Sequence, residues 1–335
     1  MKLRSHLLAL AAVAALGASA GNALAAATII NSAGTVALGI NNLGHLNTAT
    51  DNVATNSSRT GLAYNFGTTT APNFRDATSP GCFCEGWGVS VNNTISGFAN
   101  EAAGSGGLTG VTFTSTANTA TSVVNLSALS GITVTHAYAE AAAAPGALFQ
   151  ATVTIRNTTA SAVNDVKYVR VMDWDVPPSE FAELVTIRGT ATTTLREFSN
   201  DNGFASSDPL AGNPAAIVAG TTNVDFTDSG PADHGAYFRF NFGTIAAGES
   251  YTFNIFYGAA GDEAGALAAI TAADIELYSF GQSRGNGASG RPATFIFGFS
   301  GVGGTPIGVS APGSLALAGL ALIGLGAVRR SRRQA

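Results

Sequence analysis

Three acidic side chains near the middle of the chain have the type and spacing of a metal site. Asp173, Asp175 and Glu180 lie in the segment Asp-Trp-Asp-Val-Pro-Pro-Ser-Glu. Residues two apart on a β-strand point to the same side, so Asp173 and Asp175 could share one Ca²⁺ ion. Glu180 could return to that ion across the turn formed by the two prolines. Calcium prefers such hard oxygen ligands.

The same segment has two other interpretations. The carboxylates of Asp173 and Asp175 could instead accept turn amides at the strand end, while Trp174 packs in the core. Paired carboxylates also suit glycoside hydrolysis, but two acids on one strand face lie closer together than the inverting mechanism requires. We therefore keep calcium binding and a purely structural role as the two alternatives for this segment.

The only two cysteines, Cys82 and Cys84, form a Cys-x-Cys motif. In an oxidising compartment we expect them to form a disulfide, whose very short loop gives little entropic stabilisation. A metal-binding Cys-x-Cys would need further ligands, and no histidine lies within thirty residues. A Gly-x-Ser-x-Gly pattern at 281–285 lacks a following helix and any downstream histidine, so it does not indicate a serine hydrolase.

These residues must be positioned by strands. Short runs that alternate apolar and polar residues recur between turn signals, at 110–115, 132–139, 148–156, 166–173, 236–242 and 251–257. They predict an all-β fold, a large antiparallel β-sandwich with Greek-key connections. One covering helix is expected over 263–273, capped by Asp262.

Two segments resemble the strand-turn-strand units of secreted Ig-like modules. They are 148–172, in which two alternating strands flank a polar connection, and 242–257, which contains an Ala-Gly-Glu turn. The resemblance implies an Ig-like fold and no particular ligand. We expect the folded domain to span 26–300, with a glycine-rich linker at 301–308.

The charge balance argues against nucleic-acid binding. Six of the 16 basic residues and none of the 21 acidic ones lie in the two terminal segments described below. The remaining part carries 10 positive and 21 negative side chains, a net charge of −11, and a single lysine, Lys167. Binding to phosphates requires clusters of basic residues, which this part does not contain.

The N-terminus has the pattern of a secretory signal peptide. Lys2 and Arg4 precede an apolar stretch at 7–16, and the small residues Ala23 and Ala25 occupy the −3 and −1 positions of a cleavage site. We expect residues 1–25 to be removed, with cleavage after Ala20 as an alternative. The Sec translocon and signal peptidase are then the first partners of the chain.

The C-terminus combines a turn, an apolar segment and a basic cluster. An apolar run of 14 residues at 315–328 is barely long enough to span a bilayer and predicts a single hydrophobic helix. A basic cluster follows, which the positive-inside rule keeps in the cytoplasm. It consists of Arg329, Arg330, Arg332 and Arg333.

Residues 309–335 resemble the PEP-CTERM sorting signal, in which Val-Pro-Glu-Pro and Gly-Ser precede an apolar helix and several arginines. Val309, Pro312, Gly313 and Ser314 match this pattern, whereas Ser310 and Ala311 replace the usual Pro and Glu. The resemblance implies processing by the membrane enzyme exosortase after transient anchoring in the inner membrane. The alternative is an ordinary single C-terminal membrane anchor. The resemblance also implies a Gram-negative, exopolysaccharide-producing bacterium, and a mature protein at the cell surface, in the outer membrane or outside the cell.

Three functions are compatible with these features. We expect a non-enzymatic surface or extracellular matrix protein associated with exopolysaccharide in a biofilm. The first alternative is a specific carbohydrate-binding or adhesin module that depends on calcium. The second is a polysaccharide-active enzyme whose acidic residues come from distant strands.

Overall fold

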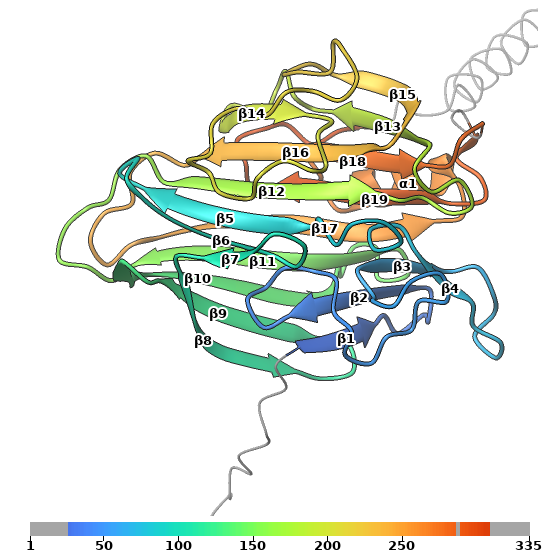
Figure 1. Cartoon of the computed structure of the whole chain (residues 1–335), viewed down its shortest axis with the longest axis horizontal. Coiled ribbons are helices and arrows are strands. Elements are labelled where there is room, and N and C mark those ends of the chain that lie inside the picture. The colour runs from blue at the N-terminus through green and yellow to red at the C-terminus, as the bar shows by residue number, and fades with distance from the viewer. Residues whose placement is uncertain (1–25, 286–288, 309–335) are drawn as a thin grey trace, which may run out of the picture.

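The computed structural model describes residues 26–285 and 289–308 of the chain (Figure 1). Their strands form three sheets in which neighbouring strands are antiparallel, and one α-helix accompanies them. The prediction of an all-β fold with a single helix is confirmed for this part of the chain. The predicted signal peptide and the predicted sorting signal lie outside the described residues.

Two large sheets and one small sheet make up the fold. The largest has nine strands, in the spatial order β15 (Phe226–Ala232), β13 (Glu183–Arg188), β18 (Leu277–Gln282), β19 (Thr294–Ser300), β17 (Ser250–Ala260), β11 (Leu148–Asn157), β10 (Leu129–Glu140), β9 (Ala120–Leu126) and β8 (Leu108–Ser115). The second has six, in the order β14 (Arg196–Asn200), β16 (His234–Asn241), β12 (Lys167–Trp174), β5 (Gly86–Val91), β6 (Ile95–Asn100) and β7 (Gly104–Gly106). The third has four, β1 (Ala26–Ile30), β2 (Val36–Asn41), β3 (Leu62–Asn65) and β4 (Phe74–Asp76).

The two larger sheets pack face to face through aromatic side chains, as expected of a sandwich. The rings of Tyr168 on β12 and Phe253 on β17 lie 4.9 Å apart, and those of Phe238 on β16 and Phe297 on β19 lie 5.7 Å apart. All four side chains are almost completely buried. Figure 1 shows the nine-stranded sheet running from β15 at the top to β8 at the bottom, with β1 to β4 at the lower right.

The predicted strands exist, but the strand-turn-strand segments are not hairpins. Strand β11 pairs with β10 and β17 along its two edges, so no edge is left for β12. Strand β12 lies in the other sheet, between β16 and β5. The chain crosses between the sheets again from β16 to β17, and Val163 and Ile245 join the two crossings by reciprocal hydrogen bonds of 3.0 and 2.9 Å.

Strand β12 is buried on both faces, whereas the sequence predicted one face in water. Tyr168, on the inner face, points into the sandwich. Val169 and Val171, on the outer face, pack against Phe198 and Tyr237. A central strand with two buried faces holds its end in a fixed position, which matters for the acidic residues that follow it.

The helix α1 (Glu263–Ala272) covers the nine-stranded sheet, as predicted. Asp262 caps it by accepting a hydrogen bond from the Gly265 amide at 2.9 Å. The buried side chains of Ala266 and Ile270 belong to a cluster that also includes Ile296 of β19. The helix ends one residue earlier than the sequence indicated.

The predicted linker at 301–308 is hydrogen-bonded to the sandwich. The Glu276 carboxylate accepts hydrogen bonds from the amides of Gly301, Val302 and Gly304 at 3.0, 2.9 and 2.8 Å, and Val302 is completely buried. The Ile307 amide donates to a backbone carbonyl at 2.9 Å. Within residues 26–285 and 289–308, no helix is long and apolar enough to cross a membrane.

Candidate cation site

The end of strand β12 positions the acidic residues. Trp174 is completely buried, and its indole N–H donates to the Ser279 hydroxyl at 3.0 Å. Because successive strand residues point to opposite sides, Asp173 and Asp175 project away from this anchored ring. The shared side of the two carboxylates was expected for calcium binding, and the packing of Trp174 in the core was expected for the purely structural alternative.

A third carboxylate joins these two. One oxygen each of Asp173, Asp175 and Asp233 lie within 4.8 Å of one another. Asp233 precedes strand β16, which pairs with β12 so that Asp173 lies opposite Gly235. The antiparallel pairing therefore brings the start of one strand to the end of the other. Asp173 and Asp175 are 1% and 0% exposed, whereas Asp233 is exposed.

Glu180, the third residue predicted from the sequence, is not part of this group. Its carboxylate lies 3.0 Å from the guanidinium of Arg75 on β4 and 3.3 Å from the Asn56 amide group. Arg75 satisfies its charge, which leaves Glu180 without need of another cation. The predicted set of three is thus brought together only in part.

Glu183, at the start of β13, is a second acid that the sequence did not indicate. It is completely buried, and one of its carboxylate oxygens accepts a hydrogen bond from the Val176 amide at 3.2 Å. Its charge adds to that of the group, because it raises the pKa of Asp173. None of the ion pairs among the described residues involves Asp173, Asp175, Asp233 or Glu183.

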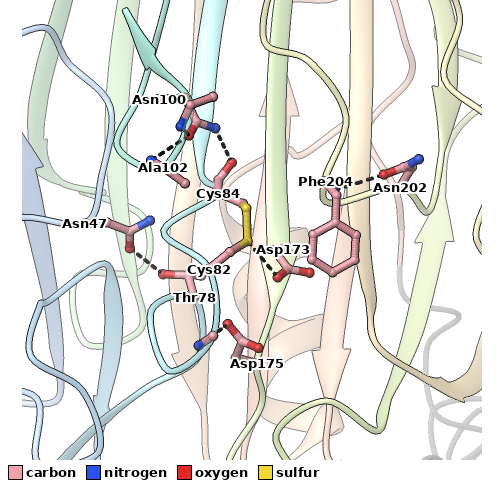
Figure 2. The surroundings of a disulfide bond; sticks show 12 residues. Asn47, Thr78, Cys82, Cys84, Asn100, Ala102, Asp173, Asp175, Asn202 and Phe204 are labelled. Atoms are coloured by element: carbon pink, nitrogen blue, oxygen red, sulfur yellow. Dashed lines mark hydrogen bonds between the residues drawn. A yellow bond between two sulfur atoms is a disulfide. The ribbon is translucent and has the colours of Figure 1, made fainter.

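The disulfide between Cys82 and Cys84 borders the site (Figure 2). The sulfur of Cys82 lies 3.3 Å from an oxygen of Asp173, and the Gly81 amide donates to Asp175 at 3.1 Å. A sulfur in a disulfide carries no hydrogen, so it cannot donate to the carboxylate as a thiol would. The loop therefore gives Asp175 one hydrogen bond and gives Asp173 none.

Several oxygens of the site are buried without a hydrogen-bond partner. They are Oδ1 of Asp173, Oδ1 of Asp175 and Oε2 of Glu183. Leaving a buried acceptor unsatisfied costs about 1–3 kcal/mol, and more when the group is charged. Glycines flank the two Oδ1 atoms, since a Cβ on Gly203 or Gly81 would lie 2.8 Å or 2.9 Å from them.

Burial and mutual repulsion raise the pKa values of these acids. The pKa of Asp173 is raised to about 9, first by burial and then by the charge of Asp175. Burial likewise raises the pKa of Asp175 to about 7 and that of Glu183 to about 8, and the nearby carboxylates add to the shift. A bound cation would remove this penalty, because it stabilises the ionised forms.

Oxygen donors alone are gathered here, which suits a hard cation. A second group, made of Cys82, Cys84 and Asp173, would suit a softer metal, but only a thiolate is a metal ligand and both sulfurs are held in the disulfide. Two exposed aromatic residues adjoin the site. The ring of Phe181 packs beside Gly81, and Phe204 follows Gly203 in the sequence. The side chains of Phe181 and Phe204 are 49% and 44% exposed.

A buried polar network in the sandwich interior is a separate feature that the sequence did not reveal. Arg170 on β12 forms an ion pair with Glu85, and both side chains are completely buried. Glu85 also accepts hydrogen bonds from the Tyr257 hydroxyl at 3.2 Å and the Leu46 amide at 2.7 Å. This network joins the small sheet to the sandwich, because Leu46 follows β2.

The neighbouring His136 is held neutral. Its pKa is well below the ordinary value, because the ring is completely buried and the Arg170 charge is close. Its Nε2 lies 2.8 Å from the Tyr168 hydroxyl. This contact joins β10 to β12 across the sandwich interior.

A cavity of about 650 Å³ lies beside helix α1 and shares no residue with the carboxylate group. Leu267 and Ile270 of the helix, Tyr278 of β18 and residues 305–308 form part of its wall. Nothing among the described residues indicates its occupant.

No protein-family model matches the chain, and no curated protein has a significantly similar sequence. The sorting-signal interpretation therefore depends on the C-terminal residues themselves.

Proposed function

We propose that the chain is an exported, non-enzymatic protein of the cell surface or extracellular matrix, associated with exopolysaccharide. In this proposal the Sec translocon and signal peptidase act on residues 1–25. Residues 309–335 then hold the protein in the inner membrane until exosortase processes it. The acidic, all-β domain between these segments is the mature protein.

The observation that carries the proposal is the combination, in one sequence, of a signal-peptide pattern at 1–25 with a turn, an apolar run and an arginine cluster at 309–335. Strand β1 begins at Ala26, which pairs with Asn41 and is only 7% exposed. Near the other predicted processing site, the Ile307 amide donates to the Ile275 carbonyl at 2.9 Å. Residues on the body side of both predicted cleavage sites are therefore part of the fold.

The surface of the nine-stranded sheet supports association with polysaccharide. Its edge strand β8 exposes the side chains of Thr109, Thr112 and Thr114. Hydroxyl groups exchange hydrogen bonds with sugars and water as donors and acceptors. Many weak contacts of this kind suit a hydrated matrix better than a single tight site.

The proposal is tested in a bacterium that carries an exosortase, by following the protein between membrane, cell surface and medium. Deletion of 309–335 is expected to release the protein to the medium, because both anchor and signal are lost. Pro312→Ala keeps the apolar segment but alters the motif, so it is expected to leave the protein in the inner membrane. Pro306→Ala, outside the motif, is the control. An unchanged distribution in both variants would contradict the proposal.

A second candidate function, calcium-dependent carbohydrate binding, is favoured by the exposed rings of Phe181 and Phe204 beside the acidic group. Acidic side chains beside exposed aromatic rings would also suit a polysaccharide hydrolase, but Asp173 and Asp175 are too deeply buried to reach a glycosidic bond. A glycan array read with calcium and with EDTA tests binding. One ligand that is lost with EDTA and in Phe181→Ala would favour this function over a passive matrix role.

A further inference from the structure

We propose that Asp173, Asp175 and Asp233 bind one calcium ion, with the buried carboxylate of Glu183 adding negative charge beside it. This site differs from the set indicated by the sequence, because Asp233 takes the place of Glu180. It goes beyond the proposed function, since it would exist whether or not the chain is exported. Its support comes from geometry, from unpaired atoms and from the type of donor.

The spacing of the oxygens fits calcium. Oxygens that bind one Ca²⁺ ion lie about 2.3–2.6 Å from it, so two of them on opposite sides are at most about 5 Å apart. The gathered oxygens of Asp173, Asp175 and Asp233 lie within 4.8 Å of one another. Asp173 lies in β12, Asp175 directly follows that strand, and Asp233 directly precedes β16, which pairs with β12.

The unpaired atoms are an independent sign of a missing partner. Asp173, Asp175 and Glu183 are at most 1% exposed, and each has a carboxylate oxygen without a hydrogen bond. A buried carboxylate that is ionised is paired with a cationic group or coordinates a metal. No lysine, arginine or histidine among the described residues forms an ion pair with any of them.

The surroundings explain access and selectivity. Asp233 is exposed, so an ion can enter on its side and keep water ligands there. Gly81 and Gly203 pack closely against Asp175 and Asp173, and a side chain at either position would crowd a carboxylate oxygen. Magnesium requires shorter distances and near-ideal octahedral geometry, so we expect it to bind more weakly than calcium.

Thermal unfolding of the full chain, purified in mild detergent with its disulfide oxidised, tests the site. Calcium at a hundred times its Kd is expected to raise Tm by about 5 °C relative to EDTA, and magnesium by much less. The rise is expected to disappear in Asp175→Asn and in Asp233→Asn. Asp233 is exposed, so its variant should fold even if the buried one does not. Glu180→Gln, whose carboxylate pairs with Arg75, should keep the rise.

Terbium luminescence locates the ion independently. Terbium(III) replaces calcium at oxygen sites and emits when a nearby tryptophan is excited. Trp174 lies between Asp173 and Asp175 in the sequence, with its ring on the opposite side of the strand. We expect emission that calcium displaces and that is lost in Asp233→Asn. The proposal is overturned if calcium leaves Tm unchanged in the full chain, or if the calcium effect and the emission persist in both aspartate variants.

This test is separate from that of the proposed function. Calcium binding is measured on purified protein, whereas sorting is measured as distribution in cells. If the chain is sorted but does not bind calcium, the matrix proposal is supported and the calcium site is contradicted. If the chain binds calcium but is not sorted, the calcium site is supported and the matrix proposal is contradicted.

Discussion

At the scale of single residues, the chain buries ionisable side chains in two different settings. Arg170 and Glu85 satisfy each other inside the sandwich, whereas Asp173 and Asp175 form no ion pair with any cationic side chain among residues 26–285 and 289–308. The sequence predicted that the two aspartates share a side, because that follows from strand geometry. It did not indicate Asp233, which lies 58 residues after Asp175, or Glu183, which lies only eight residues after Asp175 but begins a strand of the other sheet. Pairing the predicted strands 166–173 and 236–242 as antiparallel neighbours would have indicated Asp233.

Arg170→Met is expected to destabilise the protein strongly. Removing one partner of a buried ion pair leaves the other charge uncompensated, which costs about 3–5 kcal/mol. Urea unfolding of the full chain measures this loss. The double variant Arg170→Met with Glu85→Gln should recover a large part of it, because no buried charge remains. A loss below about 1 kcal/mol in the single variant would mean that the pair is not closed as described.

Glu101 is expected to make part of the stability depend on pH. A hydrogen bond from His45 lowers its pKa below the ordinary 4.5, and the Arg59 charge at 2.8 Å contributes, although partial burial opposes the shift. The unfolded state then binds more protons than the folded state below pH 4.5. This stabilisation is present above pH 4.5 and is lost as pH falls through the lowered folded-state pKa.

Glu101→Gln should therefore flatten the acidic limb of the curve of unfolding free energy against pH, and lower the stability at pH 7 by about 1 kcal/mol or less. Glu249→Gln is the control, since Glu249 is exposed and has no ion pair among the described residues. Equal acidic limbs in the wild-type chain and Glu101→Gln would show that this ion pair does not stabilise the fold.

At the scale of elements, the sequence predicted the helix and the individual strands, but it did not predict which strands pair in each sheet. The helix followed from the Asp262 cap and the small apolar residues after it. The strands followed from alternation between turn signals. Their sheets did not follow, because a polar connection suits both a hairpin and a crossing, and only the occupied edges of β11 exclude the hairpin. Burial of both faces of β12 likewise depends on Phe198 and Tyr237, which are distant in sequence.

Asp262→Ala is expected to weaken helix α1. The side chain of Asp262 accepts the Gly265 amide at 2.9 Å, and loss of an N-cap costs about 0.5–2 kcal/mol. Asp262→Asn keeps an acceptor at the cap and should cost less. It would also remove the ion pair with Arg291, but Arg291 is 70% exposed and such a pair contributes little. Chemical unfolding of the two variants side by side decides this, and equal losses would mean that the cap is not the source.

At the scale of the whole molecule, a three-sheet body lies between two predicted processing segments. Composition and alternation were sufficient to predict the all-β class, because they reflect the whole chain. The fastening of residues 301–307 to the body was not predictable, since it depends on Glu276 accepting three amides from a glycine-rich segment that resembles a free linker.

The mature ends of the protein test the central claim most directly. The full chain would be expressed in a bacterium with an exosortase, and the intact mass of the product would be measured. The account predicts a species that begins at Ala26 and ends near Pro312, with any added mass at the new C-terminus. A product that retains the chain through Arg333, or that still begins at Met1, would contradict it.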